Sequence, residues 1–489
     1  MRSEPDFLDR LETYAARSME AAKVPGLALT IVQDDAALVR RGLGRRRLGS
    51  HPRVRPDTLF QIASCGKAFT ATALAILADE GKLAWDDPVI DHLPEFRLSD
   101  AYLTARVTVR DLLTHRTGLP GGDALWMSAQ YDRKETLRRL RSLRPVHGLR
   151  ERFVYQNLMY VVAGEVVGAA SGIGWDAFVR RRILRPLRMT STLTNTAELR
   201  ARRNVAEPHA DVRGRIQGVE RWEDPVGSGD GSILSTAADM VPWLRFQLSE
   251  GALGDVRLLR RTTFREMHTS QIVVGADRWE LDFLRAMGIR RPSMAYGLGW
   301  IVMDYHGLRI VRHAGGIDGM SCVVALVPEE RLGIAVLTNL ESTPLPEALA
   351  FWIIDRRLGR PERDWTSKFL RIARGLQARE AAKGRRKEAA RVRGTQPSLP
   401  LAAYAGRYED AYYGAAAVRF RRGRLLLEYG KAVAGPLTHW HYDTFRLRPV
   451  RPPTLRSGYL TFTVGSDGRV EAMKVDAGLG EELRFVRRR

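Results

Sequence analysis

The chain has 489 residues, a length that predicts about three domains, and its 44% apolar and 27% charged residues are typical of a folded globular protein. A net charge of +22 would suit nucleic acid or an anionic membrane. However, nearly all of the 78 basic residues are Arg, and they are spread along the chain. This spread indicates a bias of composition, so we expect no nucleic-acid partner and no membrane partner.

Cysteine content and the N-terminal residues predict a cytoplasmic location. Cys65 and Cys322 are the two cysteines, which excludes a disulfide framework and is acceptable in a reducing compartment. Residues 1–23 are charged throughout and lack the apolar core of a signal peptide. The longest apolar run, ATALAILA, is too short to span a bilayer.

The N-terminal part begins with strand patterns and continues with helices. Residues 27–33 and 37–43 are predicted strands joined at a turn. Residues 64–80 carry apolar residues at helical spacing and end at a glycine. A mostly helical region is expected from there to about residue 290, and it includes a buried helix over 157–172 that is apolar on nearly every side.

Strand patterns return at residues 308–314, 322–327 and 333–338, and residues 344–358 are a predicted helix. Strands at both ends with helices between them predict an α/β (α+β) domain. Its first and last strands would pair in one antiparallel sheet, and the helices would form a second lobe. A cleft between such lobes is a common place for a site.

The rest of the chain divides into a linker and a second domain. We assign residues 1–360 to the first domain and residues 361–398, which are rich in Ala, Arg, Lys and Glu, to a polar helical linker. Residues 399–489 alternate short strands with glycine turns, which predicts a small all-β barrel.

Ser64 and Lys67 form the first candidate catalytic pair, in the stretch SCGK. Residues three apart on a helix lie one above the other, about 5–6 Å apart at Cβ. The start of an apolar helix also favours negative charge that develops on the serine oxygen. The alternative is a helix-start serine beside an exposed lysine.

Two further stretches, YQN and HAGG, carry candidate residues. Tyr155 and Asn157 precede the predicted buried helix, and a phenol beside an ammonium group can be pushed toward phenolate and then accept a proton. His313 ends a predicted strand and is followed by Gly315 and Gly316, which allow a substrate to approach the backbone. The alternatives are an ordinary turn before a helix and a histidine at the end of a hairpin.

In this order, SCGK, YQN and HAG resemble the three signature motifs of the serine β-lactamase and penicillin-binding protein superfamily. LPEF (93–96), DLLTHRTGLPGG (111–122), YGLGW (296–300) and STAADMVPWL (235–244) resemble its class C-like branch of esterases and D-aminopeptidases. The tail, with YAGRYED and LTHWHYDTF, resembles the lipocalin-like C-terminal domain of some members. The resemblance implies a β-lactamase-like fold, an antiparallel sheet flanked by helices plus a helical lobe, followed by the barrel.

The resemblance also implies a role for each candidate residue. Ser64 would be the acylated nucleophile, Lys67 would hold or remove its proton, and Tyr155 would be the general base that later protonates the leaving group. Asn157 would orient Lys67 and the substrate. Within His313-Ala314-Gly315, His313 and Gly315 would line the substrate site.

The resemblance further implies an oxyanion hole and a cofactor-free reaction. The amides of Ser64 and Gly316 would bind the oxyanion. No metal and no organic cofactor is implied. The partner would be a small-molecule ester or peptide substrate, and a homo-oligomer is left open.

The third motif departs from the lactamase pattern, because His313-Ala314-Gly315 stands where β-lactamases and carboxypeptidases usually have K-T-G. A neutral imidazole and a methyl group cannot replace a permanent cation and a hydroxyl. We therefore expect a serine hydrolase of carboxylic esters or small amides and peptides. A β-lactamase or DD-carboxypeptidase remains an alternative, as does a non-catalytic ligand-binding protein that keeps the fold.

Other residues are interpreted as structural. His439 and His441 would share a strand face, but no third metal ligand is apparent. Cys65 is expected to pack against its helix. His115 is expected to hold a loop near the lobe interface, and Asp239 to complement a helix dipole.

Overall fold

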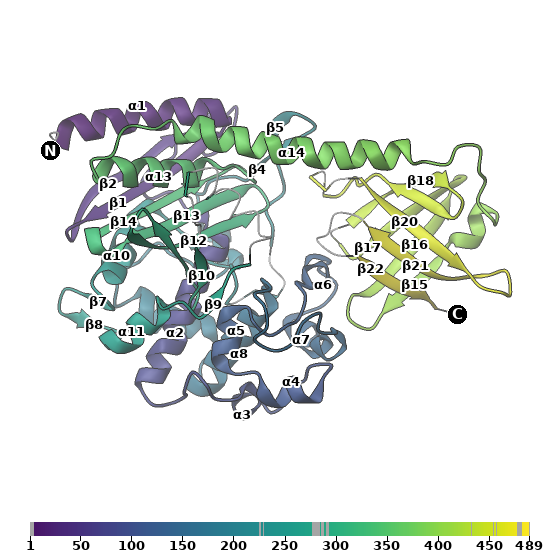
Figure 1. The fold of residues 1–489 in the computed structure, drawn as a ribbon, viewed down its shortest axis with the longest axis horizontal. Helices are drawn as coiled ribbons and strands as arrows, with labels where there is room; N and C mark the ends of the chain where they lie inside the picture. The colour runs from purple at the N-terminus through teal and green to yellow at the C-terminus, as the bar shows by residue number, and fades with distance from the viewer. Residues whose placement is uncertain are drawn as a thin grey trace.

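The computed structural model of the chain describes residues 4–223, 226–227, 229–275, 284, 288–289, 293–431, 433–452, 454–455, 457–476 and 482–488. Within these ranges, strands from residues 26–44 and from residues 272–338 build an eight-stranded antiparallel sheet in the order β2-β1-β14-β13-β12-β11-β10-β9 (Figure 1). The strands are β1 (Gly26–Gln33), β2 (Ala36–Gly44), β9 (Ile272–Val273), β10 (Met294–Tyr296), β11 (Ile301–Tyr305), β12 (Leu308–Ile317), β13 (Met320–Val327) and β14 (Leu332–Thr338).

The first and last strands of this domain in chain order lie side by side in the sheet. β1 and β14 are antiparallel neighbours, with Leu29 opposite Val336. The prediction that strands from the two ends of this domain share one sheet is therefore confirmed. The central strands β1, β13 and β14 are almost wholly buried because each face of the sheet is covered there, so their sequences are continuously apolar and not alternating.

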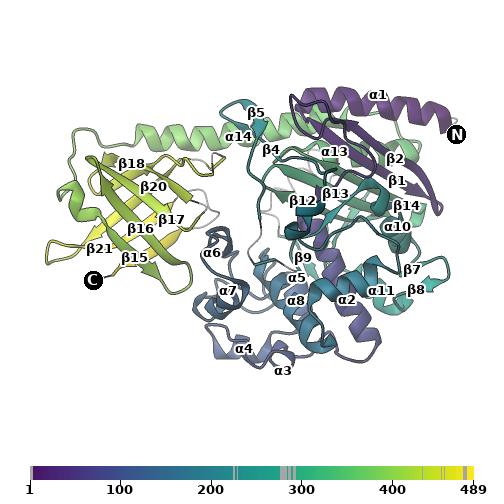
Figure 2. The same ribbon diagram turned by 180° about the vertical axis from the view of Figure 1, so that it is seen from behind.

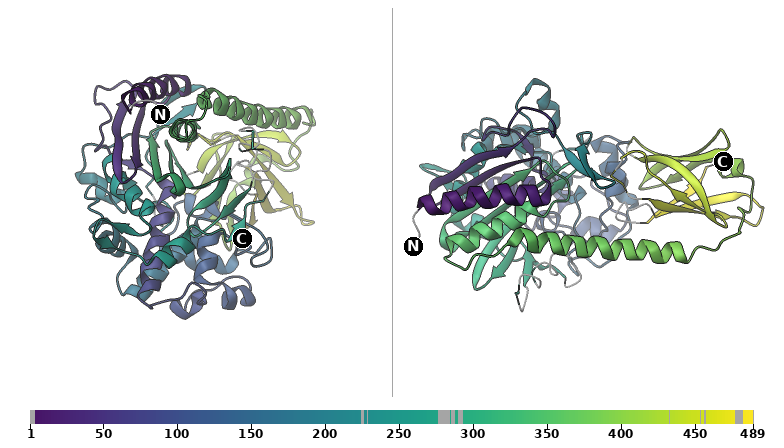
Figure 3. Two further views of the ribbon diagram at one scale, coloured as in Figure 1. Left: turned by 60° about the vertical axis from the view of Figure 1, so that its left-hand side comes forward. Right: turned by 90° about the horizontal axis from the view of Figure 1, so that it is seen from above.

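One face of the sheet is covered by α1 (Glu4–Ala22), α13 (Leu345–Arg357) and the start of α14 (Trp365–Ala389). Figure 3 shows α1 and α14 lying over the sheet in the view from above. Tyr14 of α1 stacks on Trp352 of α13 with ring centroids 4.7 Å apart. This aromatic packing is part of a core that is separate from the one on the opposite face.

The opposite face packs on α2 (Lys67–Asp79), α10 (Ala237–Leu248) and the helical lobe around α8 (Leu158–Ser171). Phe69 and Trp243 stack there with centroids 3.8 Å apart. The predicted helix over 64–80 begins with a 3-10 turn, η1 (Ala63–Gly66), and becomes α-helical at Lys67. Of the helices described, none is by itself long and apolar enough to cross a membrane; only a pair bent by 72°, Leu158–Ser171 with Trp175–Leu184, passes on length and composition.

The region predicted as mostly helical also contains short strands. Strands of two to four residues are too short to give a periodic pattern, which is why the sequence did not reveal them. The remaining helices are α3 (Val89–His92), α4 (Ala101–Arg106), α5 (Val109–Thr114), α6 (Asp123–Met127), α7 (Arg133–Arg139), α9 (Trp175–Val179), α11 (Arg261–Met267), η2 (Leu140–Ser142), η3 (Arg180–Leu184), η4 (Thr196–Ala201) and η5 (Pro328–Glu330). The short strands are β3 (Phe60–Gln61), β4 (His209–Val212), β5 (Arg215–Gly218), β6 (Leu234–Ser235), β7 (Ala252–Leu253) and β8 (Val256–Arg257).

The C-terminal part is a closed antiparallel barrel of β15 to β22, which confirms the predicted barrel. Aromatic side chains of Tyr404, Tyr408, Phe445 and Phe462 fill its interior. Its strands are β15 (Gly406–Asp410), β16 (Gly414–Arg421), β17 (Arg424–Tyr429), β18 (Val433–His441), β19 (Thr444–Leu447), β20 (Gly458–Val464), β21 (Val470–Asp476) and β22 (Leu483–Arg487), preceded by η6 (Leu401–Tyr404).

His439 and His441 of β18 both have protein partners. The register of β18 shifts between them. Nε2 of His439 is 2.9 Å from the carbonyl oxygen of Tyr442, and Nδ1 of His441 accepts from the amide of Val392 at 3.3 Å. Among the described residues no group of three or more His, Cys, Asp or Glu side chains could hold a metal ion.

Helix α14 is less uniformly solvated than its sequence indicated. Trp365 and Phe369 in its first turns are buried against α13, and the indole of Trp365 donates to the Asp355 carboxylate at 2.9 Å. The C-terminal half is exposed and runs across to the barrel (Figure 1). Two apolar residues four apart make a stripe of a single turn, which is too short to recognise in the sequence.

The barrel lies beside α6 and α7 of the helical lobe, which separate it from the sheet in the view from behind (Figure 2). Arg139 of α7 donates to the carbonyl oxygen of Ala411 at 2.8 Å, and the amide of Lys431 donates to the carbonyl oxygen of Ser128 at 2.8 Å. The barrel is therefore attached to the first domain by α14 and also by direct contacts.

The packing of α14 generates a stability test. Phe369→Ala should lower the free energy of unfolding by about 3–5 kcal/mol, because it leaves a cavity in the core that the sheet forms with α1, α13 and the start of α14. Arg379→Ala, on the exposed half of the same helix, should change that free energy by less than about 0.5 kcal/mol. Urea unfolding of the two variants measures both values, and equal effects would contradict the assignment of this turn to the core.

Candidate active site

Ser64 stands at a tight turn between the short strand β3 and helix α2. Ala63, directly before it, has φ +46°, a left-handed conformation that costs a residue with a side chain about 1–2 kcal/mol. The carbonyl oxygen of Ser64 accepts from the amide of Lys67 in the 3-10 turn. The strained turn leaves Ser64 partly exposed while its neighbours Cys65 and Lys67 are buried.

The amine of Lys67 is fully buried and contacts three oxygen atoms. Nζ donates to Ser64 Oγ at 3.1 Å, to Asn157 Oδ1 at 2.7 Å and to the carbonyl oxygen of Asp230 at 2.8 Å. An ammonium group has three donors, so these acceptors satisfy it completely. The structure thus brings Ser64, Lys67 and Asn157 together, as their predicted roles require.

Asn157 lies at the start of α8, and its amide has a defined orientation. Its Nδ2 donates to both carboxylate oxygens of Asp123, at 3.2 and 3.3 Å, while its Oδ1 faces Lys67. Asp123 also accepts from the indole of Trp126 at 2.8 Å. The sequence analysis did not single out Asp123, whose only signal was its place directly after the quoted motif DLLTHRTGLPGG.

Tyr155 lies with its ring toward the same amine. Lys67 Nζ is 5.0 Å from the centroid of Tyr155 and 5.2 Å from that of Tyr160. His115 packs on Tyr155 with centroids 4.2 Å apart, and its Nδ1 accepts from the amide of Gln156 at 3.1 Å. His115 therefore holds the YQN segment, in agreement with the structural role expected for it.

Two further buried phenols, Tyr160 and Tyr296, surround this group and were not predicted as site residues. Burial raises the pKa of both well above the ordinary value for tyrosine. Both are therefore held neutral and act as hydrogen-bond donors. Tyr160 donates to the carbonyl oxygen of Leu113 at 2.6 Å.

His313 on β12 is buried, and both of its ring nitrogens are engaged. Nδ1 is 2.7 Å from the carbonyl oxygen of Ala314, and Nε2 is 2.8 Å from the hydroxyl of Tyr296. Nδ1 therefore carries the hydrogen and Nε2 accepts from the phenol. Burial, followed by the nearby Lys67 charge, lowers the pKa of His313 to about 3, so the imidazole is neutral at physiological pH.

Gly315 of β12 packs directly on the segment that leads to Ser64. A Cβ atom there would lie 2.2 Å from the carbonyl oxygen of Ile62 and 2.5 Å from Cys322 Sγ. At Gly316 an added Cβ would meet no heavy atom within 4 Å. This close approach requires glycine at position 315, whereas a side chain at position 316 would have open space.

Cys65 and Cys322 lie together behind the nucleophile as free thiols, with Sγ atoms 3.6 Å apart. Cys65 donates to the carbonyl oxygen of His313 at 3.2 Å, and Cys322 donates to that of Ile62 at 2.9 Å. The packing role expected for Cys65 is confirmed, and its neighbour Cys322 comes from a strand distant in sequence.

Asp230 belongs to a loop that presses against α2 and α8. Gly229 has φ +111°, and a Cβ on it would lie 2.3 Å from the carbonyl oxygen of Tyr160, so this position needs glycine. Burial raises the pKa of the Asp230 carboxyl, and the Lys67 ammonium opposes the rise. The sequence analysis missed this residue because its role at Lys67 is carried by a backbone oxygen.

Asp239 has more partners than a helix-dipole role requires. It accepts from the amides of Ser191 and Thr192, at 2.8 and 2.7 Å, and from the Thr192 hydroxyl at 2.8 Å. Its own amide donates to Thr236 at 3.0 Å at the start of α10. Asp239 thus joins the loop at 191–192 to α10.

A cavity of about 660 Å³ borders the glycines of β12 on the side of α13 and α14. Its charged lining residues are Arg312, Asp318, Glu341 and Glu347, of which Arg312 and Glu347 pair at 3.0 Å. Burial, followed by repulsion from Asp318, raises the pKa of Glu341 to about 7. The cavity therefore combines an apolar lining with an excess of carboxyl groups.

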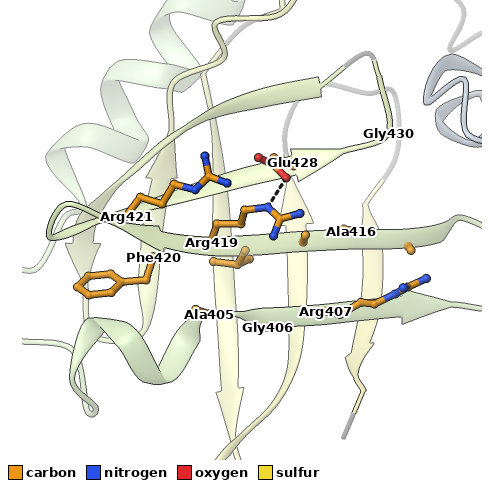
Figure 4. A pocket seen from close by; sticks show the side chains of 12 residues that line it. Ala405, Gly406, Arg407, Ala416, Arg419, Phe420, Arg421, Glu428 and Gly430 are labelled. Carbon is orange, nitrogen blue, oxygen red and sulfur yellow. Dashed lines mark hydrogen bonds and ion pairs between the residues drawn. The ribbon is translucent and has the colours of Figure 1, made fainter.

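A second pocket, of about 700 Å³, lies on the barrel (Figure 4). Its lining is mainly Ala and Arg, and Arg419 pairs with Glu428 at 2.6 Å across neighbouring strands. No candidate catalytic residue is among its described lining residues. We therefore place the candidate active site at Ser64 and not in this larger pocket.

Comparison with solved structures shows the fold. The octameric penicillin-binding protein homologue from Pyrococcus abyssi superposes with a TM-score of 0.64, covering 98% of this chain and 100% of that chain at 24% identity. SurE superposes with a TM-score of 0.57, covering 99% and 100% at 20% identity. Both similarities extend over the barrel as well as the sheet and the helical lobe.

Comparison with known sequences shows the class and the family. Unguisins hydrolase ungD of Aspergillus violaceofuscus is 29% identical over 83% of this chain and 75% of its own length, and Protein flp of Staphylococcus aureus (strain COL) is 23% identical over 70% and 65%. The chain is a serine hydrolase. It belongs to the Beta-lactamase family, whose model matches residues 11–357. A domain of unknown function, DUF3471, matches residues 390–487.

The glycines of β12 provide a matched pair of variants. Gly315→Ala should lower the free energy of unfolding by about 1–3 kcal/mol, because the added methyl overlaps the backbone of Ile62. Gly316→Ala should change it by less than about 0.5 kcal/mol. Chemical denaturation compares them, and a destabilised Gly316→Ala protein with an unaffected Gly315→Ala protein would refute the packing described.

Glu341 generates a test of pH dependence. Its pKa is about 7 in the folded protein against an ordinary 4.5, so the folded state holds a proton that the unfolded chain releases at lower pH. Stability should therefore fall as the pH rises from about 4.5 to about 7. Glu341→Gln should remove most of this fall, whereas Glu95→Gln, at an exposed position, should keep it. Thermal melting at pH 5 and pH 7.5 measures the difference; an unchanged slope in Glu341→Gln would contradict the prediction.

Proposed function

We propose that the protein hydrolyses carboxylic esters or small amides and peptides through an acyl-enzyme on Ser64. The observation that carries this proposal is the buried amine of Lys67, 3.1 Å from Ser64 Oγ and held by Asn157 and the Asp230 carbonyl. A lysine that only stabilised the fold would not need a partly exposed serine hydroxyl as its third acceptor.

The proposed reaction has two halves. Ser64 Oγ attacks the substrate carbonyl carbon, and its proton passes to Tyr155, which acts as a phenolate beside the Lys67 ammonium group and then holds the proton as a phenol. The amides of Ser64 and Gly316 bind the oxyanion, and collapse of the intermediate breaks the bond to the alcohol or amine, which leaves with that proton. Water then attacks the acyl-enzyme ester, gives its proton to Tyr155 and releases the carboxylic acid, and Ser64 regains its hydrogen.

The charge around β12 supports an uncharged group over a carboxylate as the part of the substrate near this strand. His313 is neutral, and the Arg312 guanidinium is paired with Glu347. Asp318 and Glu341 add carboxyl groups to the adjoining cavity. A β-lactam or a D-Ala terminus brings a carboxylate to this position, so we rank penicillin recognition second, favoured by family membership alone.

Relatives indicate which substrates to test. Two fungal relatives are named as hydrolases of unguisins. A structure of the fold neighbour SurE with D-Leu superposes on this chain with a TM-score of 0.55. We therefore include D-amino-acid derivatives beside simple esters. One fold neighbour is described as octameric. On this basis we propose that this chain also forms a homo-oligomer.

The proposal is tested with a substrate panel of short p-nitrophenyl esters, D- and L-amino-acid anilides and a chromogenic cephalosporin. Ser64→Ala should lower kcat on any accepted substrate by about 10⁴-fold or more, because the nucleophile is lost. Ser457→Ala, at an exposed barrel serine, is the matched control and should keep full activity. Turnover retained by Ser64→Ala would show that Ser64 is not the nucleophile, and preferred turnover of the cephalosporin would favour the second candidate.

A further inference from the structure

Two barrel tyrosines reach the helical lobe and bind the backbone of α6 at its N-terminus. The hydroxyl of Tyr412 donates to the carbonyl oxygen of Gly122 at 3.0 Å, and that of Tyr429 lies 3.0 Å from the carbonyl oxygens of both Ala124 and Tyr413. Both tyrosines are buried, with 2% of their surface exposed. The contacts are therefore made in a region from which water is largely excluded.

At this contact the helical lobe and the barrel each bury one residue in the apolar core of the other. Ala124 of α6 is buried within the apolar core of the barrel, whereas Tyr412 of the barrel packs with the core of the helical lobe. Gly122 has φ +68°, and a Cβ on it would lie 2.2 Å from the Tyr412 hydroxyl. The glycine and the tyrosine thus fit each other, and no larger residue could replace the glycine without displacing the ring.

The residue between these two attachment points is Asp123, the carboxylate that receives the amide of Asn157. Helix α6 has five residues, and Gly122 before it offers no side-chain cap. So short a helix cannot maintain its position by its own hydrogen bonds. Its position, and that of Asp123, depends on tertiary contacts: Leu125 is buried in the core of the helical lobe, and Tyr412 and Tyr429 contact the backbone on either side of Asp123.

Asp123 determines which end of the Asn157 amide faces Lys67. A carboxylate only accepts hydrogen bonds, so it binds the NH₂ end and leaves Oδ1 for the amine. In the reversed orientation the NH₂ group of Asn157 would oppose the ammonium group, and a carbonyl-type oxygen would oppose the carboxylate. Both contacts would be repulsive in a buried site.

We propose that the C-terminal barrel is a positioning element for the catalytic amine. Tyr412 and Tyr429 fix α6, Asp123 orients the amide of Asn157, and that amide holds Lys67 beside Ser64. Asp123, Tyr412 and Tyr429 are positioning residues, since none of them touches the reacting atoms. This inference rests on the proposed function and assigns to the barrel a part in the rate of the reaction.

The first experiment removes the two hydroxyls and keeps both rings, in the full-length Tyr412→Phe/Tyr429→Phe protein. On the best ester of the panel, kcat should fall about tenfold with KM changed less than about twofold, because a small displacement of Lys67 affects the transition state more than binding. Tyr442→Phe, at an exposed tyrosine of the same barrel, is the matched control and should retain the kcat of the unmodified protein.

The second experiment places the barrel and Asp123 in one double-mutant cycle. Asp123→Ala should lower kcat, and Asp123→Asn should recover most of it, since the side-chain oxygen of asparagine can still accept from Asn157. In the Asp123→Ala background, the two Tyr→Phe changes should lower kcat by less than about twofold further, because they act through the same carboxylate. Circular dichroism and thermal melting identify the variants that fold, and the single Tyr→Phe proteins replace the double variant if it does not.

The outcomes separate the two proposals. If the unmodified protein lacks activity, or Ser64→Ala retains it, the proposed function fails. If the unmodified protein is active and Ser64→Ala is not, the barrel proposal is overturned by a double Tyr→Phe protein with the kcat of Tyr442→Phe. Independent, multiplicative losses from Asp123→Ala and the tyrosine changes overturn it as well, and so does an Asp123→Asn protein as slow as Asp123→Ala.

Discussion

The structure of this enzyme depends on the burial of one amine. Lys67 has no exposed surface, and a buried ammonium group without partners would cost several kcal/mol. Its three acceptors come from Ser64, Asn157 and Asp230, which belong to three separate segments of the chain. The fold must place these three acceptors within hydrogen-bond distance of Lys67 Nζ. The same arrangement therefore assembles the site and avoids an unpaired charge in the core.

Neighbouring features can be understood as consequences of that requirement. Glycines at 229 and 315 allow the loop of Asp230 and the strand β12 to approach α8 and Ile62 at distances that a side chain would prevent. The left-handed Ala63 directly precedes Ser64, which is partly exposed while Lys67 is buried. The strained Ala63 and these two glycines occur where the backbone surrounds the Lys67 amine. The packed cores on both faces of the sheet compensate for their cost in stability.

How much could be predicted from the sequence depended on the length scale of each signal. The strands β12 to β14 and the helices α2 and α8 were predictable because apolar runs of that length have few alternatives. Ser64, Lys67, Tyr155 and Asn157 were found through short motifs. Asp123 and the carbonyl of Asp230 could not be found in this way, because one acts through another side chain and the other through its backbone. The buried first turns of α14 were missed for a similar reason, since contacts made by one turn leave no periodic pattern.

The fold itself does not decide the substrate. A penicillin-binding architecture places a nucleophile, an amine and a phenol together, and these groups can cleave an ester, an amide or a lactam. Discrimination then depends on the charge that meets the rest of the substrate. Here the imidazole of His313 is neutral, the guanidinium of Arg312 is paired with Glu347, and Asp318 and Glu341 contribute carboxyl groups. A substrate carboxylate would gain no free cation from these four residues, because Arg312 is already paired, and burial raises the pKa of both Asp318 and Glu341 and so favours their neutral forms.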